Sequence, residues 1–167
     1  NAQNSSAMLS TAADGVTSTM SVLDNMRSSL TDLLNSPTGS SRFQQVNKEI
    51  SDSISQVDAL GSAVQFNGKS LLDGTQSTTV SNGSGGYASV AMPNLTSQAL
   101  GLTDKNGKSA LDLSSTDGIQ KALDTVSNAY DTALSAATSL GAAQQNLTYS
   151  AANSTTTAEN LTSAAST

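Results

Sequence analysis

Hydrophobic residues recur at helical spacing over the first third of the chain. Alternating steps of three and four residues link Leu9, Ala12, Val16, Thr19, Leu23, Met26, Leu30 and Leu33, and all of these except Thr19 are apolar. The pattern predicts a long helix with one buried seam. A second seam, at Phe43, Val46, Ile50, Ile54, Val57, Leu60 and Val64, predicts another helix over about 42–64.

The segment between these two patterns carries strong helix-breaking signals. It reads Asn35–Ser41 and contains Pro37 and Gly39, which disfavour a continuing helix. Its serines are suited to cap the helix that follows. Because the connection is short, the two helices are expected to form an antiparallel hairpin.

The helical period is lost between residues 65 and 115. Asn67-Gly68 predicts a tight turn, and Asp73-Gly74 predicts a second one. Short strands are expected over 77–80 and 87–92. The glycine-rich stretch 82–86 between them lacks the spacing and the lysine of a phosphate-binding loop, so we interpret it as the tip of a β-hairpin.

The last part of the chain has the longest regular pattern. Steps of four and three link Ile119, Leu123, Val126, Tyr130, Ala133, Ala137, Leu140, Gln144, Leu147, Ala151, Ser154, Ala158, Leu161 and Ala165. A helix of about 50 residues would be roughly 75 Å long. Heptads sustained over this length predict coiled-coil packing.

The composition suits a thin core between long helices. Aromatic residues make up 3% of the chain, and tryptophan and cysteine are absent. A thick globular core normally uses large aromatic and aliphatic side chains. The predicted fold class is therefore mainly α, an elongated antiparallel bundle of long helices or coiled coil with a small β-hairpin region.

Charge and residue chemistry exclude several functions. A net charge of −6 with only seven basic residues argues against nucleic acid as a partner. The absence of histidine and cysteine excludes His-based triads and thiolate or imidazole metal sites. We interpret Asp52, Asp58, Asp112 and Asp117 as solvated charges, and Asp73 and Asp104 as turn residues.

These observations predict a protein that is not an enzyme. We expect no catalytic residues, cofactor or metal, and no nucleic-acid or membrane partner. No stretch approaches the roughly 18 apolar residues that a membrane-spanning helix needs.

Several ordered segments resemble bacterial flagellin. Asn1–Asn4 with Leu9–Gly15, and then Val22–Arg27, are similar to the start of that family's outer core domain. Closer matches follow at Gln65–Gly74, Leu140–Leu147 and Ala158–Thr162. The set appears in the family's order and covers both halves of the chain.

The resemblance implies a helical rod and a division of the chain into three parts. Residues 1–74 would be the N-terminal half of the outer core domain, with two helices and a β-turn. Residues 75–114 would be a short hairpin and loop region in place of large outer domains, and residues 115–167 the C-terminal long helix. We interpret both ends of the chain as cuts that remove the family's terminal polymerising segments.

The resemblance also implies function, partners and location. It predicts a secreted structural subunit of the extracellular flagellar filament that acts in motility by self-assembly. Expected partners are other flagellin subunits, an export chaperone and cap proteins. A hook–filament junction protein and a flagellin-like surface adhesin or binding module remain alternatives.

One contact surface of the family can be transferred residue by residue. Flagellins that a vertebrate innate immune receptor recognises present an arginine and a leucine one turn apart, and a glutamate on the next helix. Those positions fall on Asn25, Ser29 and Glu49, and Arg27 matches a neighbouring arginine of the family. These four residues form the candidate receptor or subunit contact surface, and the resemblance implies weak receptor binding.

Overall fold

The apolar seam of the first 34 residues forms the centre of the fold. In the computed structural model, all eight predicted seam positions from Leu9 to Leu33 are buried on helix α1 (Ala2–Leu34). The polar member of the seam, Thr19, donates its hydroxyl hydrogen to the backbone oxygen of Gly15 at 3.0 Å. This bond satisfies the hydroxyl, so a polar side chain is accommodated in the core.

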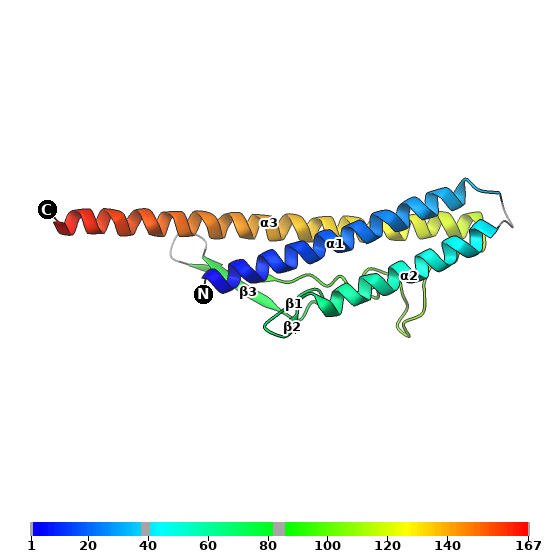
Figure 1. Cartoon of the computed structure of the whole chain (residues 1–167), viewed down its shortest axis with the longest axis horizontal. Coiled ribbons are helices and arrows are strands. Elements are labelled where there is room, and N and C mark those ends of the chain that lie inside the picture. Colours follow the sequence, from blue (N-terminus) through cyan, green and yellow to red (C-terminus); the bar gives the residue numbers. More distant parts are fainter. Residues whose placement is uncertain (1, 38–40, 82–85, 167) are drawn as a thin grey trace.

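Two further helices pack along α1 to give an elongated rod. Helix α2 (Ser41–Ala63) runs antiparallel to α1, and the long helix α3 (Thr116–Ser166) also runs antiparallel to it (Figure 1). Helix α1 contacts both α2 and α3 extensively. The predicted helical hairpin and the predicted mainly α, elongated fold class are confirmed.

The structure describes residues 2–37, 41–81 and 86–166, and for residues 2, 81 and 149–166 it describes the backbone alone. The backbone of α3 extends past the N-terminal end of α1 (Figure 1). The predicted seam positions from Ala151 to Ala165 therefore lie outside the residues whose side chains are described.

On α3, the buried stripe differs from the predicted seam at every second position. Ile119, Val126, Ala133, Leu140 and Leu147 are buried as predicted. The predicted intermediate positions, namely Leu123, Tyr130, Ala137 and Gln144, are only half-buried. Three buried alanines lie one residue before such positions, namely Ala122, Ala129 and Ala143. Small side chains at the line of contact let two helices approach closely, and the larger side chains then lie at its margin.

Close approach also explains a glycine on α1. A Cβ atom added at Gly15 would lie 2.8 and 2.9 Å from the two methyl carbons of Val64 and 3.0 Å from Cδ1 of Leu72. Val64 directly follows α2, and Leu72 follows the first hairpin. Gly15 thus lets the end of α2 and this hairpin pack directly on α1.

Two antiparallel hairpins follow α2. Strands β1 (Gln65–Phe66) and β2 (Lys69–Ser70) pair through Gln65↔Ser70 and Phe66↔Lys69. Asn67 and Gly68 connect them with φ values of 54° and 78°. Positive φ at both central residues is typical of the type I′ turn that an Asn-Gly pair predicts.

The second hairpin also matches its predicted position. Strands β3 (Ser77–Ser81) and β4 (Tyr87–Ala91) pair antiparallel from Ser77↔Ala91 to Ser81↔Tyr87. Residues 82–85 of its predicted tip lie outside the described residues. The hydroxyl of Ser5 on α1 lies 2.8 Å from the Thr78 hydroxyl and donates to the Thr79 backbone oxygen at 3.0 Å, so β3 is bonded to α1.

Carboxylates hold the segment that returns from β4 to α3. Asp58 on α2 accepts hydrogen bonds from the backbone N–H and the hydroxyl of Ser97, at 2.9 and 2.7 Å. Asp58 is therefore not simply a solvated charge, because it anchors this segment to α2. Asp73 and Asp104 accept backbone N–H bonds from residues two positions later, which confirms them as turn residues. Asp112 makes the same kind of turn with Ser114.

Candidate functional site

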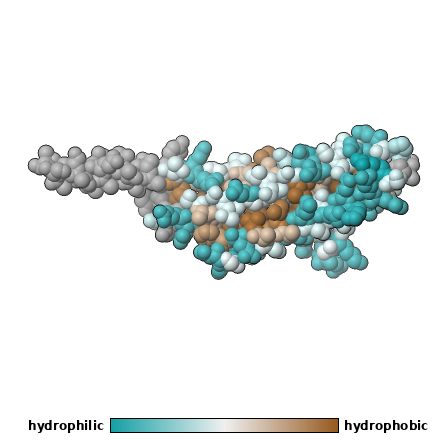
Figure 2. Space-filling model, viewed as in Figure 1, coloured by the Kyte–Doolittle hydropathy of each residue, from teal (hydrophilic) through white to brown (hydrophobic). Residues whose placement is uncertain are grey.

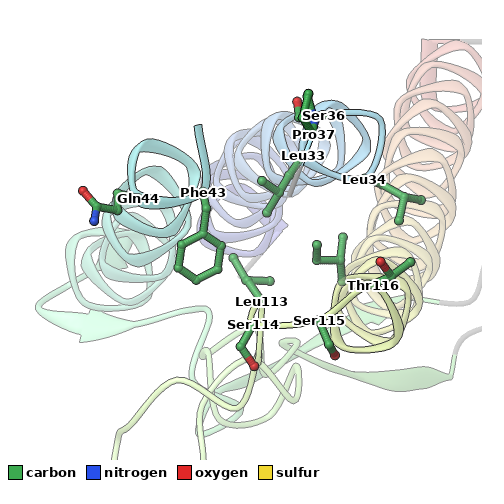
Figure 3. Close-up of a pocket in the computed structure, with 11 residues that line it drawn as sticks. Leu33, Leu34, Ser36, Pro37, Phe43, Gln44, Leu113, Ser114, Ser115 and Thr116 are labelled. Atoms are coloured by element: carbon green, nitrogen blue, oxygen red, sulfur yellow. The ribbon is translucent and has the colours of Figure 1, made fainter. Parts of the chain in front are cut away.

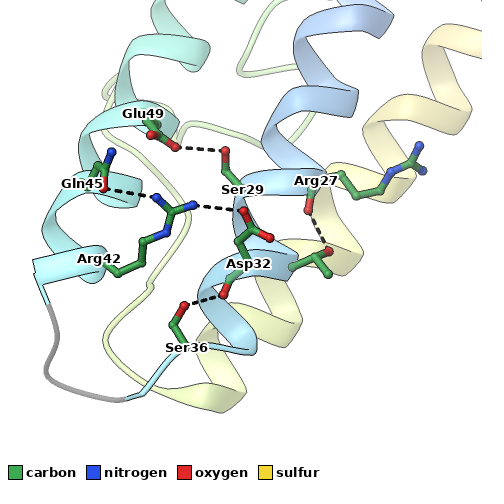
Figure 4. A network of polar contacts seen from close by, with 8 residues as sticks. Arg27, Ser29, Asp32, Ser36, Arg42, Gln45 and Glu49 are labelled. Atoms are coloured by element: carbon green, nitrogen blue, oxygen red, sulfur yellow. Dashed lines mark hydrogen bonds and ion pairs between the residues drawn. The ribbon is translucent and has the colours of Figure 1, made fainter.

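The candidate contact residues lie where α1 and α2 run side by side. Asn25 and Ser29 are four residues apart on α1 and therefore share a face. Asn25 is exposed, and Ser29 is half-buried. The Ser29 hydroxyl donates to Oε2 of Glu49 on α2 at 3.1 Å (Figure 4). The structure thus brings together Ser29 and Glu49, with Asn25 one turn away.

Arg27 lies on a different side of α1. It is two residues from Ser29, which corresponds to about 200° around a helix. Its guanidinium pairs with Asp24 and lies over the ring of Tyr130 on α3, 4.6 Å from the ring centroid. In Figure 4, Arg27 points towards α3 and Ser29 towards α2. The four candidate residues therefore belong to two faces of the rod.

A polar network beside the Ser29–Glu49 pair was not predicted. Arg42 at the start of α2 pairs with Asp32 of α1 at 3.0 Å and donates to Gln45 at 3.2 Å (Figure 4). The Ser36 hydroxyl donates to the backbone oxygen of Asp32 at 2.7 Å. The helical hairpin brings Asp32 and Arg42 together. In the sequence, only their opposite charges on either side of the connecting loop could have indicated this pair.

Farther along α2, Lys48 pairs with Asp52 at 2.8 Å, one turn apart on the same helix. The hydrogen bond that Lys48 donates to Asp52, and the negative charge of Asp52, raise the pKa of Lys48. Both side chains are largely exposed, so this pair contributes little to stability. It leaves Asp52 as the surface charge that the sequence predicted.

The end of the rod near the α1–α2 connection contains an open pocket of about 410 Å³ (Figure 3). Apolar side chains from both helices and from the start of α3 face it, together with hydroxyl and amide groups. Its lining comprises Leu33, Leu34, Ser36, Pro37, Phe43, Gln44, Leu113, Ser114, Ser115, Thr116 and Ile119. No carboxylate, amine or guanidinium lines it, so it lacks groups for acid–base chemistry.

An apolar groove lies along the side of the rod between α1 and α2. Val22 and Leu60 contribute its larger side chains, and Ala59 and Ala63 its smaller ones. Hydrophobic surface appears along the middle of the rod in Figure 2, and hydrophilic surface dominates the end at which α1 turns into α2. Scattered apolar exposure is normal, and a groove between two helices is a suitable place for contact with another chain.

Two other kinds of feature are absent from the part of the chain that the structure describes. Over the residues that the structure describes, no group of three or more histidine, cysteine or acidic side chains is arranged to hold a metal ion. In the same part of the chain, no helix is both long and apolar enough to cross a membrane.

One comparison with known proteins finds a match for the N-terminal part of the chain. Residues 1–77, which comprise α1, α2 and the first hairpin, match the family model of the bacterial flagellin N-terminal helical region. The resemblance to bacterial flagellin is confirmed. No curated protein matches the chain.

Solved flagellins have the same fold. The crystal structure of Bacillus cereus flagellin superposes with a TM-score of 0.76 at 18% identity, covering 98% of this chain and 93% of that one. The structure of FliC from Burkholderia pseudomallei gives a TM-score of 0.72 at 16% identity, covering 85% of this chain and 99% of that one. The flagellin fold thus extends beyond the N-terminal match to include α3.

Proposed function

We propose that this chain is a subunit of the bacterial flagellar filament and acts by self-assembly in motility. The observation that carries the proposal is the match of residues 1–77 to the flagellin family, combined with a flagellin fold over nearly the whole chain. Flagellin is a structural protein rather than an enzyme. In this proposal, residues 1–74 and 115–167 form one core, and residues 75–114 form its short outer region.

The distribution of charge supports assembly through many weak contacts. Between Asn1 and Leu23 the only charged residue is Asp14, and no charged residue occurs from Thr132 to Ala158. Figure 1 shows the start of α1 beside the second half of α3, so these uncharged stretches lie at the same end of the rod. Burying serine, threonine and alanine surface avoids the desolvation cost of burying charges.

The proposed partners follow from the same assignment. Other copies of the chain would bind along the faces of the helices, including the groove beside Val22 and Leu60. An export chaperone would bind the chain before export, and cap proteins would act during assembly outside the cell. We further propose that Asn25, Ser29 and Glu49 form a contact face towards a subunit or receptor, with Arg27 on the neighbouring face.

Electron microscopy of the full-length gene product tests the proposal. A filament subunit forms long filaments by itself. A hook–filament junction protein does not form them, and an adhesin binds its ligand as a monomer. Antibodies raised against the outer region should decorate such filaments along their whole length. Labelling confined to one end of a filament, or no filaments at all, would contradict the proposal.

A further inference from the structure

Three Asn-Gly dipeptides occur in the sequence, and the structure describes two of them, Asn67-Gly68 and Asn106-Gly107. This dipeptide is chemically labile in water. The backbone nitrogen that follows an asparagine can attack the side-chain amide carbon, and a glycine has no side chain to obstruct that approach. The two pairs therefore allow a comparison within one molecule.

The Asn67-Gly68 pair is open to this reaction. Both residues are exposed in the turn between β1 and β2. The space where a Cβ of Gly68 would lie contains no atom within 4 Å. Within the described residues, the Gly68 N–H makes no hydrogen bond. The turn is closed by only two residue pairs, and so short a ladder opens at low cost.

The Asn106-Gly107 pair is also exposed but is held in place. The Gly107 N–H donates to the backbone oxygen of Asp104 at 3.0 Å. The N–H groups of Asn106 and Lys108 both donate to Oδ1 of Asp104, at 2.8 and 3.0 Å. The attacking nitrogen is therefore already engaged, and the loop around it must break several bonds before the ring can close.

We propose that Asn67 is a site of spontaneous deamidation, with Asn106 as its protected counterpart. The Gly68 backbone nitrogen loses its proton to water or hydroxide and bonds to Cγ of Asn67. The side-chain nitrogen takes up one proton from water, its bond to Cγ breaks, and ammonia leaves. The resulting cyclic imide takes up one water molecule, which opens either carbonyl and leaves aspartate or isoaspartate at position 67. No oxidant or enzyme is needed.

The isoaspartate product should disturb the packing around the first hairpin. In isoaspartate the backbone continues through the side-chain carboxyl carbon, so the backbone is one atom longer. This extra atom lies in a turn whose flanking strands pair in a fixed register. Leu71 and Leu72, both with 0% exposure, follow within a few residues, and the Leu71 N–H donates to the Val64 oxygen at 3.0 Å. A longer turn should displace the hydrogen bond between Leu71 and Val64, and Val64 lies beside Gly15 of α1.

Peptide mapping by mass spectrometry during incubation in mildly alkaline buffer tests the proposal on the unmodified chain. Deamidation at Asn67 should exceed that at Asn106 by about fivefold, which is the rate equivalent of one net hydrogen bond. Isoaspartyl methyltransferase labelling should locate the isoaspartate in the same peptide. Equal rates, a faster rate at Asn106, or an intact Asn67 while a short peptide of the same sequence deamidates would each overturn the proposal.

Asp104→Ala provides a matched variant. It removes the carboxylate that holds Asn106 and Lys108, so deamidation at Asn106 should rise while the rate at Asn67 stays unchanged. Circular dichroism verifies that the variant keeps its helices. An unchanged rate at Asn106 in a folded Asp104→Ala chain would show that the Asp104 carboxylate does not protect this site, and would overturn that part of the proposal.

Discussion

Arg27 of α1 lies over the ring of Tyr130 of α3, with its guanidinium carbon 4.6 Å from the ring centroid. Asp24, one turn earlier on α1, pairs with the same guanidinium. Tyr130 is one of the larger residues at the margin of the α1–α3 contact, where its ring remains half-buried. The pair therefore links the two longest helices outside their apolar seam.

Replacing Tyr130 with leucine should destabilise the chain modestly. The change keeps an apolar side chain but removes the ring, and a cation–π contact at a partly exposed site is worth about 0.5–1 kcal/mol. Denaturant melts of Tyr130→Leu, Arg27→Met and the double variant form a double-mutant cycle. A coupling energy near zero would show that Arg27 and Tyr130 are neighbours without an energetic link.

Gly15→Ala should be clearly destabilising, by about 1–3 kcal/mol, because the new methyl group meets Val64 and Leu72 at 2.8–3.0 Å. Gly141→Ala on α3 is the matched control, since no atom lies within 4 Å of its added Cβ. That change should stabilise by up to about 1 kcal/mol through helix propensity alone. Thermal melts that place both variants on the same side of the parent chain would contradict the close approach at Gly15.

Leu140→Asp should be severely destabilising, by about 3 kcal/mol or more. Leu140 is 1% exposed in the α3 stripe, and the change buries an unpaired charge there. Thr138→Asp, at an exposed position two residues away, should have a mild effect. Urea denaturation followed by circular dichroism measures both variants. Similar losses would show that the stripe is not buried where we assign it.

Acid should weaken the turns at Asp73 and Asp112. Hydrogen bonds from Thr75 and Ser114 lower the pKa of these carboxyls below the ordinary value of 3.8. The stability that these hydrogen bonds give to the folded state is fully present above a pH equal to that value. It is lost as the pH falls through the lowered pKa of the folded state. Asp73→Asn with Asp112→Asn keeps the accepting oxygen without a titrating group, so this variant should lose less stability in acid. Equal acid sensitivity of parent and variant in melts would refute this assignment.

The unmodified chain should be a poor agonist of the vertebrate innate immune receptor. Asn25 lacks the planar charged fork of arginine, and Ser29 lacks an apolar anchor. The Ser29 hydroxyl moreover donates to Glu49, which stands where the resemblance implies the glutamate of the family. Loss of about 2 kcal/mol at each position corresponds to roughly a thousandfold weaker binding.

A receptor reporter assay on the parent chain and on Asn25→Arg with Ser29→Leu measures this effect. The double change should restore signalling, and Thr138→Asp on another face of the rod is a matched control that should not. Strong signalling by the parent chain would show that the transferred contact pattern does not apply to these residues.

The sequence by itself determined where the helices and hairpins lie. The spacing of apolar residues identified eight buried positions of α1, from Leu9 to Leu33, and Pro37 with Gly39 located the break before α2. Asn67-Gly68 specified its turn because few residue pairs adopt positive φ at both positions. These features depend on local periodicity and backbone sterics, which are properties of short segments.

The tertiary structure alone decided which neighbouring residues touch. On α3, alanine and a larger residue often stand side by side, so the sequence pattern allowed either stripe. The close approach of α1 selects Ala122 and Ala129 for the line of contact and leaves Leu123 and Tyr130 at its margin. In the candidate site, the same packing turns Ser29 towards Glu49 and Arg27 towards Tyr130. The rotation and separation of whole helices fix such choices, and no single segment encodes them.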